Sequence, residues 1–166
     1  AYTNAPQRLA DPRAAQIDLV ILRESTEGLF YSAAVHGRSE GDGEHEVRDT
    51  LRITRDTTEK LHHFGFKYAA KRKARGKPGH LTCVDKANVF RSMAFFRQIF
   101  DEVKADYPDT PVGYNYVDAQ ALDLVRKPWD FDVLVMENMF GDILSDLAGG
   151  LVGGMGMAAC AEIGDE

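Results

Sequence analysis

The sequence of 166 residues has few cysteines, no long apolar segment and no surplus of positive charge. Its two cysteines, Cys83 and Cys160, are far apart, without a CxxC pair or a histidine at ligand spacing. We interpret them as buried small side chains in a reducing compartment, and because no export signal opens the sequence we expect a cytoplasmic protein. The apolar stretch 147–161 is shorter than the roughly 20 residues that cross a bilayer, so no membrane association is predicted.

The net charge of −6 argues against nucleic acid as a partner, because phosphate binding requires an excess of lysine and arginine. One basic cluster departs from this balance: Lys67, Lys71, Arg72, Lys73, Arg75 and Lys77. It follows Leu61, Phe64 and Tyr68, which have helical spacing, and cations are favoured at a helix C-terminus. We therefore interpret the cluster as the solvated end of a helix rather than a nucleic-acid site.

Four short runs rich in β-branched and aromatic residues predict strands at 17–22, 80–84, 112–117 and 131–136. Apolar residues at helical spacing lie between them, and the most regular series is Val89, Met93, Phe96, Phe100, Val103 and Tyr107. We expect this series to be a core-facing helix face. Strands that alternate with helices predict a single α/β domain, 1–166, with a mostly parallel sheet flanked by helices.

The segment 31–50 does not fit this alternation. It is rich in glycine and charge (HGRSEGDGEHEVRD) and has few apolar residues of its own. We predict a loop or an exposed hairpin arm there. Because a lone hairpin has open edges and is unstable in water, we expect such an arm to pair with another chain.

Polar side chains follow all four predicted strands. They are Arg23 after the first, Asp85, Lys86 and Asn88 after the second, Asp118 after the third, and Glu137 and Asn138 after the fourth. The carboxyl ends of parallel strands lie at one edge of a sheet, where open α/β sheets bind ligands. The sequence therefore predicts a site at this edge.

Two further aspartates, Asp142 and Asp146, lie four residues apart in FGDILSD. Apolar residues occupy the opposite helical arc: Ile143, Leu144, Leu147 and Leu151. This spacing alone fits either metal ligands or the solvated face of a helix. Together with Asp118, the two carboxylates would suit Mg²⁺ or Mn²⁺ better than zinc, which prefers cysteine and histidine. A nearby lysine could act as a base, and an arginine could hold a substrate carboxylate.

Four ordered motifs resemble a known family. RESTEG (23–28), VDKANV (84–89), YVDAQAL (116–122) and ENMFGDILSDLAGGL (137–151) are similar to segments of the isopropylmalate/isocitrate dehydrogenases, which are metal-dependent β-decarboxylating dehydrogenases. The resemblance implies NAD(P)-dependent oxidation and decarboxylation of a 2-hydroxy acid with a second carboxylate. It implies the smaller substrate and dimerisation domain of that fold, which lacks the GxGxxG fingerprint. It also implies a homodimer that pairs its arms, 31–50, and shares its active sites.

The resemblance also implies a role for each site residue. Arg23 would hold a substrate carboxylate, and Lys86 would be the catalytic base with Asp118 beside it. Asn88, Glu137 and Asn138 would lie near the cofactor. Asp118, Asp142 and Asp146 would surround Mg²⁺ or Mn²⁺, with Lys86 and Asp118 from one subunit and the other two aspartates from its partner.

Two features depart from the family pattern. The family has a tyrosine seven residues after the motif arginine, where this sequence has Phe30 followed by Tyr31. We predict that Phe30 faces the site and Tyr31 faces away. The earlier substrate arginines and the later adenosine loop of the family do not occur, so we expect a portion of a longer enzyme that is inactive alone. Two alternatives stay open: a non-catalytic regulatory homologue of the same fold, and a phosphoacceptor domain with an acidic Mg²⁺ pocket.

Overall fold

A parallel sheet forms the centre of the structure, as the alternation of strands and helices predicts. Its strands are β1 (Val20–Arg23), β4 (Leu81–Asp85), β5 (Val112–Tyr116) and β6 (Val133–Met136). They lie in the order β1-β6-β4-β5, and every neighbouring pair is parallel. This computed structural model describes residues 9–32, 39–154, 156 and 158–164.

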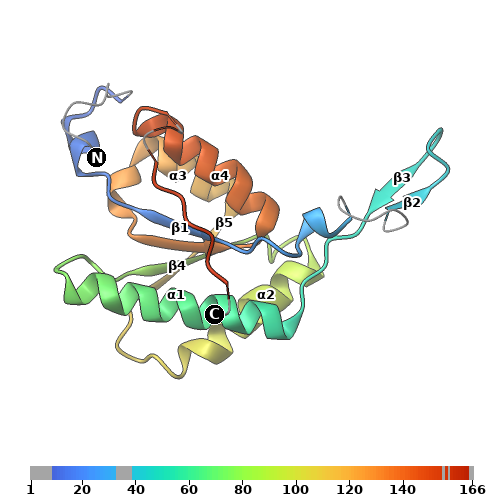
Figure 1. The fold of residues 1–166 in the computed structure, drawn as a ribbon, viewed down its shortest axis with the longest axis horizontal. Helices are drawn as coiled ribbons and strands as arrows, with labels where there is room; N and C mark the ends of the chain where they lie inside the picture. The colour runs from blue at the N-terminus through green and yellow to red at the C-terminus, as the bar shows by residue number, and fades with distance from the viewer. Residues whose placement is uncertain (1–8, 33–38, 155, 157, 165–166) are drawn as a thin grey trace.

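Helices cover both faces of the sheet (Figure 1). They are α1 (Arg55–Ala74), α2 (Arg91–Lys104), α3 (Val117–Arg126) and α4 (Asn138–Leu151). In Figure 1, α1 and α2 lie below the sheet, and α3 and α4 lie above it. Short 3-10 helices occur at Pro12–Gln16, Leu29–Tyr31 and Pro128–Asp130.

The apolar face of α2 packs into the core as predicted. Met93, Phe96, Phe100 and Val103 are all buried. Val89 was wrongly included in this helix face, because α2 begins at Arg91 and the Val89 side chain is 60% exposed. The backbone before the helix forms a turn that directs this side chain into solvent.

The basic cluster lies at the end of α1, as expected, with Lys71, Arg72 and Lys73 in its last turn. Arg72 is not solvated, however. Its Nε donates to Asp132 Oδ1 at 2.5 Å, and Asp132 is buried. The interpretation as a solvated helix end is therefore wrong for Arg72, because a buried carboxylate attracts its guanidinium away from water.

The two cysteines differ in their surroundings. Cys83 is buried in β4, as expected, and burial raises the pKa of its thiol. Cys160 is exposed, so its assignment to the interior is wrong. It lies beyond the end of α4, where the chain has no regular structure to cover it.

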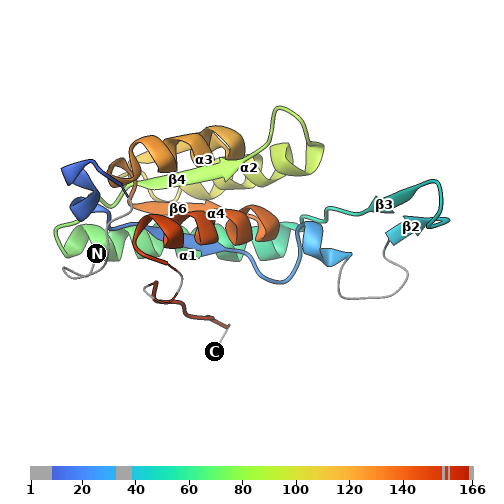
Figure 2. The same ribbon diagram turned by 90° about the horizontal axis from the view of Figure 1, so that it is seen from above.

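A two-stranded antiparallel hairpin projects from the body of the molecule (Figure 2). It consists of β2 (Ser39–Gly41) and β3 (Val47–Asp49), and every residue in 39–50 is exposed. Asp42 shapes its turn by accepting N–H bonds from Glu44, His45 and Glu46. This hairpin lies within the predicted arm 31–50, of which 33–38 fall outside the described residues, and its dimerisation role stays a prediction.

Among the described residues, no helix is both long enough and apolar enough to cross a bilayer.

Candidate active site

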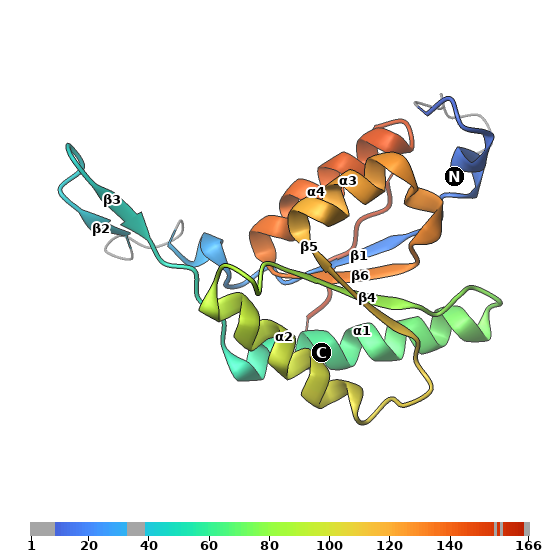
Figure 3. The ribbon, with the colours of Figure 1, turned by 180° about the vertical axis from the view of Figure 1, so that it is seen from behind.

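Two neighbouring strands of the sheet, β4 and β6, are followed by helices on opposite faces. The chain leaves β4 for α2 on one face, and it leaves the neighbouring strand β6 for α4 on the other face (Figures 1 and 3). Ligands of open α/β sheets bind at such a switch point, outside the carboxyl ends of the strands. The residues that follow β1, β4, β5 and β6 all lie at this edge, as predicted.

Arg23, the last residue of β1, is bound by the start of α4. Its Nε donates to Asn138 Oδ1 at 2.9 Å, and its NH1 donates to Asp142 Oδ1 at 2.5 Å. The pair is partly accessible, with 32% of the Arg23 side chain and 48% of the Asp142 side chain exposed. Gly141 permits the close approach, because a Cβ there would lie 2.6 Å from the Arg23 Cβ. The arginine and one predicted metal ligand therefore share one cluster.

Buried acids shape the loop after β1. The Glu24 carboxylate accepts the N–H groups of Thr26 and Glu27 at 2.6 and 2.7 Å. Glu27 in turn accepts the N–H of Thr54 at 2.7 Å, and its carbonyl accepts Asn138 Nδ2 at 3.0 Å. Asn138 thus connects this loop to Arg23, and its own side chain is nearly inaccessible at 2% residue exposure.

Glu137 caps the helix α4. Its carboxylate accepts the N–H of Phe140 at 2.7 Å, and burial raises its pKa above the ordinary value. Gly28 packs against it with a φ of +71°, and a Cβ at Gly28 would lie 2.2 Å from Glu137 Oε2. Glu137 is completely buried, whereas Asn88 is exposed in the turn after β4. Their cofactor contacts stay predictions.

Phe30 and Tyr31 lie in a 3-10 turn rather than in a strand. The guanidinium carbon of Arg23 is 5.4 Å from the centre of the Phe30 ring. That of Arg52 is 4.8 Å from the centre of the Tyr31 ring. Phe30 therefore lies beside the candidate substrate arginine, and Tyr31 lies beside a different arginine.

Lys86 and Asp118 form a second cluster. They are joined by a short ion pair, with 23% of the lysine side chain and 66% of the aspartate side chain exposed. The hydrogen bond from Lys86 holds the pKa of Asp118 below its ordinary value. Asp118 also lies in the first turn of α3, where the helix dipole favours a negative charge.

The structure brings these predicted residues together as two pairs. Arg23 ends β1 and Asp118 follows β5, and these are the two outer strands of the sheet. Within the described parts of the chain, no three acidic, histidine or cysteine side chains are grouped so that they could hold a metal. Asp142 and Asp146 lie on α4, whereas Asp118 lies in the first turn of α3, the neighbouring helix on the same face of the sheet.

Sequence reasoning gave no role to Arg97, nor to Tyr114 and Tyr116, whose ring centres lie 5.5 and 5.2 Å from the Arg97 guanidinium carbon. Arg97 binds the Asp85 carboxylate with two nitrogens, at 2.7 and 2.9 Å. The signal in the sequence that could have indicated a role for Arg97 is its position directly after Phe96, a residue of the core-facing helix series.

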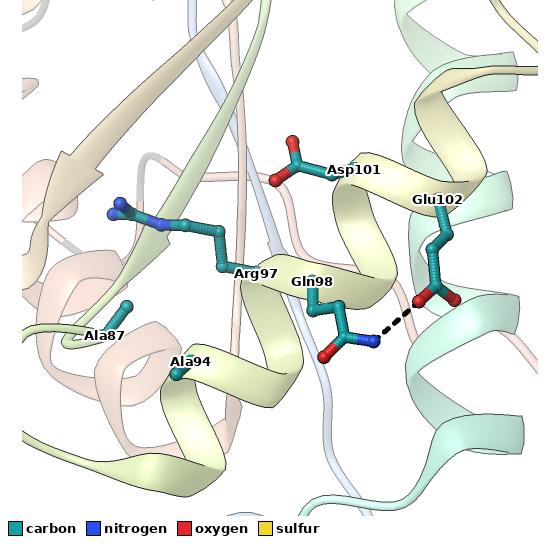
Figure 4. Close-up of a pocket in the computed structure, with 6 residues that line it drawn as sticks. All are labelled: Ala87, Ala94, Arg97, Gln98, Asp101 and Glu102. Carbon is teal, nitrogen blue, oxygen red and sulfur yellow. Dashed lines mark hydrogen bonds between the residues drawn. The ribbon is translucent and has the colours of Figure 1, made fainter.

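A pocket of about 440 Å³ lies beside this pair on the outer side of α2 (Figure 4). It is lined by Ala87, Ala94, Arg97, Gln98, Asp101 and Glu102. Its charged groups all have partners, since Arg97 binds Asp85, Asp101 accepts from Tyr114, and Glu102 accepts from Arg55. We therefore do not assign a ligand to this pocket.

Comparison with known proteins identifies the family of the chain. A family profile described as isocitrate/isopropylmalate dehydrogenase matches residues 2–166, so the chain belongs to that family. It is 43% identical over 148 residues to the 3-isopropylmalate dehydrogenase of Aquifex aeolicus, covering 89% of this chain and 39% of that protein. It is 42% identical over 152 residues to the 3-isopropylmalate/3-methylmalate dehydrogenase of Methanocaldococcus jannaschii, covering 90% of this chain and 44% of that protein.

A solved structure shares the fold. The isocitrate dehydrogenase of Methylococcus capsulatus superposes with a TM-score of 0.76 at 36% identity, covering 92% of this chain and 42% of that one. The chain has the fold of this family, as predicted, and spans about two fifths of the length of the relatives it matches.

Proposed function

We propose that the whole protein containing this chain is an NAD(P)-dependent, divalent-metal-dependent dehydrogenase. Its substrate would be a 2-hydroxy acid with a second carboxylate, of the 3-isopropylmalate or isocitrate type, which is oxidised and then decarboxylated. Family membership supports the class of reaction. The observation that carries the proposal is the position of two cation–carboxylate pairs, Arg23–Asp142 and Lys86–Asp118, at the carboxyl edge of a parallel sheet.

The residues of this chain suit the chemistry. Arg23 is oriented by Asn138 and Asp142, so its planar fork is held ready for a substrate carboxylate. Lys86, oriented by Asp118, would accept the proton of the substrate hydroxyl in its neutral amine form, directly or through water. The chemistry that Mg²⁺ or Mn²⁺ supplies when bound is stabilisation of negative charge on the substrate oxygens. Asp142 and Asp146 offer carboxylate oxygens, which suit such hard cations.

A second copy of the chain would complete the site. One chain holds Asp118 apart from Asp142 and Asp146, so three carboxylates require a contribution from a partner. Exposed apolar side chains on the adjacent helices α3 and α4 offer a surface for that partner: Leu122, Val125 and Ile143 are 55%, 50% and 54% exposed. Ile143 was predicted on the apolar arc of α4, but that arc is too wide to be covered within one chain. A two-fold dimer brings one such surface against its copy.

Manganese binding tests the metal site. We expect Asp142→Asn in the full-length protein to weaken Mn²⁺ binding, measured by electron paramagnetic resonance, and to reduce turnover. The matched control is Asp109→Asn, an exposed aspartate at the opposite end of the sheet, which should bind Mn²⁺ as the wild type does. Equal Mn²⁺ affinity in both variants would mean that Asp142 belongs only to the solvated face of α4.

A non-catalytic regulatory homologue is the second candidate, and Phe30 favours it. Phenylalanine has no proton to donate and lies beside Arg23, where the family pattern has a tyrosine. Turnover of a panel of 2-hydroxy diacids by the full-length protein, with Mn²⁺ and either nicotinamide cofactor, separates the two. Binding of a diacid without any reduction of cofactor would support the regulatory function.

A further inference from the structure

Among the described residues, two arginine–aspartate pairs with a buried aspartate attach helices to the sheet. Arg72 of α1 binds Asp132, which directly precedes β6, at the amino end of the strands. Arg97 of α2 binds Asp85, the last residue of β4, at the carboxyl end. The two pairs have the same chemistry, but only the second lies next to a residue of the candidate active site.

The Asp85 carboxylate is saturated with hydrogen bonds. It is completely buried, and it accepts Arg97 Nε at 2.7 Å and Arg97 NH2 at 2.9 Å. Its Oδ1 also accepts the N–H of Ala87 at 2.8 Å. The carboxylate therefore holds the backbone on both sides of Lys86, because Lys86 lies between Asp85 and Ala87.

The turn after Lys86 is fixed as well. The Lys86 carbonyl accepts the N–H groups of Val89 and Phe90, each at 3.0 Å. Together with the bond from Ala87 to Asp85, these contacts leave the backbone at Lys86 little freedom. The direction in which its side chain leaves the backbone is thereby determined.

The Lys86 side chain is guided by the same group of residues. The Arg97 guanidinium lies 5.2 Å from the centre of the Tyr116 ring, and Lys86 Nζ lies 5.7 Å from it. Tyr116 pairs with Asp85 in the sheet. Figure 4 shows Arg97 reaching from α2 towards the sheet, whereas Glu102 points towards α1. Arg97 thus holds both Asp85 and the ring over which the lysine extends.

We propose that Asp85 and Arg97 are positioning residues, which aim the Nζ atom of Lys86 at Asp118 and at the substrate hydroxyl. This inference rests on the proposed function for the role of Lys86 as a base. A buried ion pair contributes little net stability compared with apolar residues of similar volume, so the fold alone does not require this pair. A shift of about 1 Å in a catalytic group, by contrast, can cost about 10²-fold in rate.

The experiment compares two double variants that remove one buried pair each. Asp85→Leu with Arg97→Met removes the pair beside Lys86. The matched control, Asp132→Leu with Arg72→Met, removes the pair at the other end of the sheet, where Asp132 likewise accepts backbone N–H groups, from Gly79 and His80. Three quantities are measured: the unfolding midpoint, kcat and KM of the full-length protein, and the acylation rate of Lys86, followed by mass spectrometry.

We expect similar unfolding midpoints for the two double variants. The Asp85/Arg97 variant should lose about 10²-fold in kcat with little change in KM, and its Lys86 should be acylated several times faster. The control should keep the wild-type kcat and acylation rate. Equal kcat and equal Lys86 acylation in the two double variants would overturn the proposal.

Two single variants keep the test decisive if the double variant does not fold. Arg97→Lys keeps the charge but loses the two-nitrogen contact, so it should lower kcat less than Arg97→Met does; equal values for the two would overturn the proposal. Lys86→Ala separates this inference from the proposed function. Full turnover by Lys86→Ala would contradict the catalytic role of the lysine, while the acylation rates would still decide whether Asp85 and Arg97 position it.

Discussion

Gly141 of α4 packs directly against Arg23, the candidate substrate-binding arginine. A Cβ at this position of α4 would lie 2.6 Å from both the Cβ and the Cγ of Arg23. Real side chains do not approach so closely, and the obstacle is the base of the arginine side chain rather than its flexible end. Gly141→Ala must therefore move α4 away from β1, and with it the contact between Arg23 and Asp142.

Two opposing effects set the size of the change. Alanine is favoured over glycine in a helix by up to about 1 kcal/mol. Inserting a methyl group into a filled space costs about 1–3 kcal/mol. We therefore expect Gly141→Ala to lower the free energy of unfolding by about 0–2 kcal/mol. Gly150→Ala is the matched control, because a Cβ there meets nothing within 4 Å and only the helix preference remains.

The assay is urea unfolding of the two variants beside the wild type, together with Mn²⁺ binding by the full-length protein. Gly141→Ala should be less stable than Gly150→Ala by about 1–3 kcal/mol. It should also bind Mn²⁺ more weakly, because the displaced helix carries Asp142. Equal stability of the two alanine variants would refute the close contact between α4 and Arg23.

Three further predictions concern other parts of the molecule. Burial lowers the pKa of His62 to about 4 from 6.5, so the free energy of unfolding falls by about 3 kcal/mol as the pH falls from 6.5 to 4. In His62→Leu, the free energy of unfolding measured with urea should no longer fall by this amount over the same pH range. An unchanged pH dependence in His62→Leu would contradict the prediction. Phe30→Tyr in the full-length protein should keep or raise the rate of decarboxylation, whereas a loss of that rate in Tyr31→Phe would show that the wrong aromatic residue was placed at the site. Leu122→Asp should convert a dimer into a monomer in sedimentation, and a variant that stays dimeric would exclude the exposed face of α3 as the interface.

The sequence predicted the sheet well because its strands are short runs rich in β-branched and aromatic residues. Every residue of β4 and β6 is buried, and polar residues follow each of these strands directly. Parallel strands then place these polar residues at one edge, whatever the details of the loops. The helix α3 was not predicted as an element, because it is short and two of its larger apolar side chains, Leu122 and Val125, are exposed.

The contacts within the site were less predictable. Arg23 binds Asn138 across 115 positions of sequence, and Arg72 reaches Asp132 across 60. Such pairs depend on which strands become neighbours, and local spacing does not contain that information. Val89 was misassigned for a local reason, since hydrogen bonds to the Lys86 carbonyl form a turn where the apolar spacing predicts a helix.

Restoration of activity by mixing two inactive variants tests the shared active site most directly. Full-length Lys86→Ala and Asp142→Asn proteins are each assayed alone, then mixed, refolded together and assayed again. If each site combines Lys86 of one subunit with Asp142 of its partner, a mixed dimer has one intact site. Half of the dimers are mixed after random reassembly, so we predict about a quarter of the wild-type turnover. A mixture that is as inactive as its two components, although mixed dimers have formed, would contradict the account.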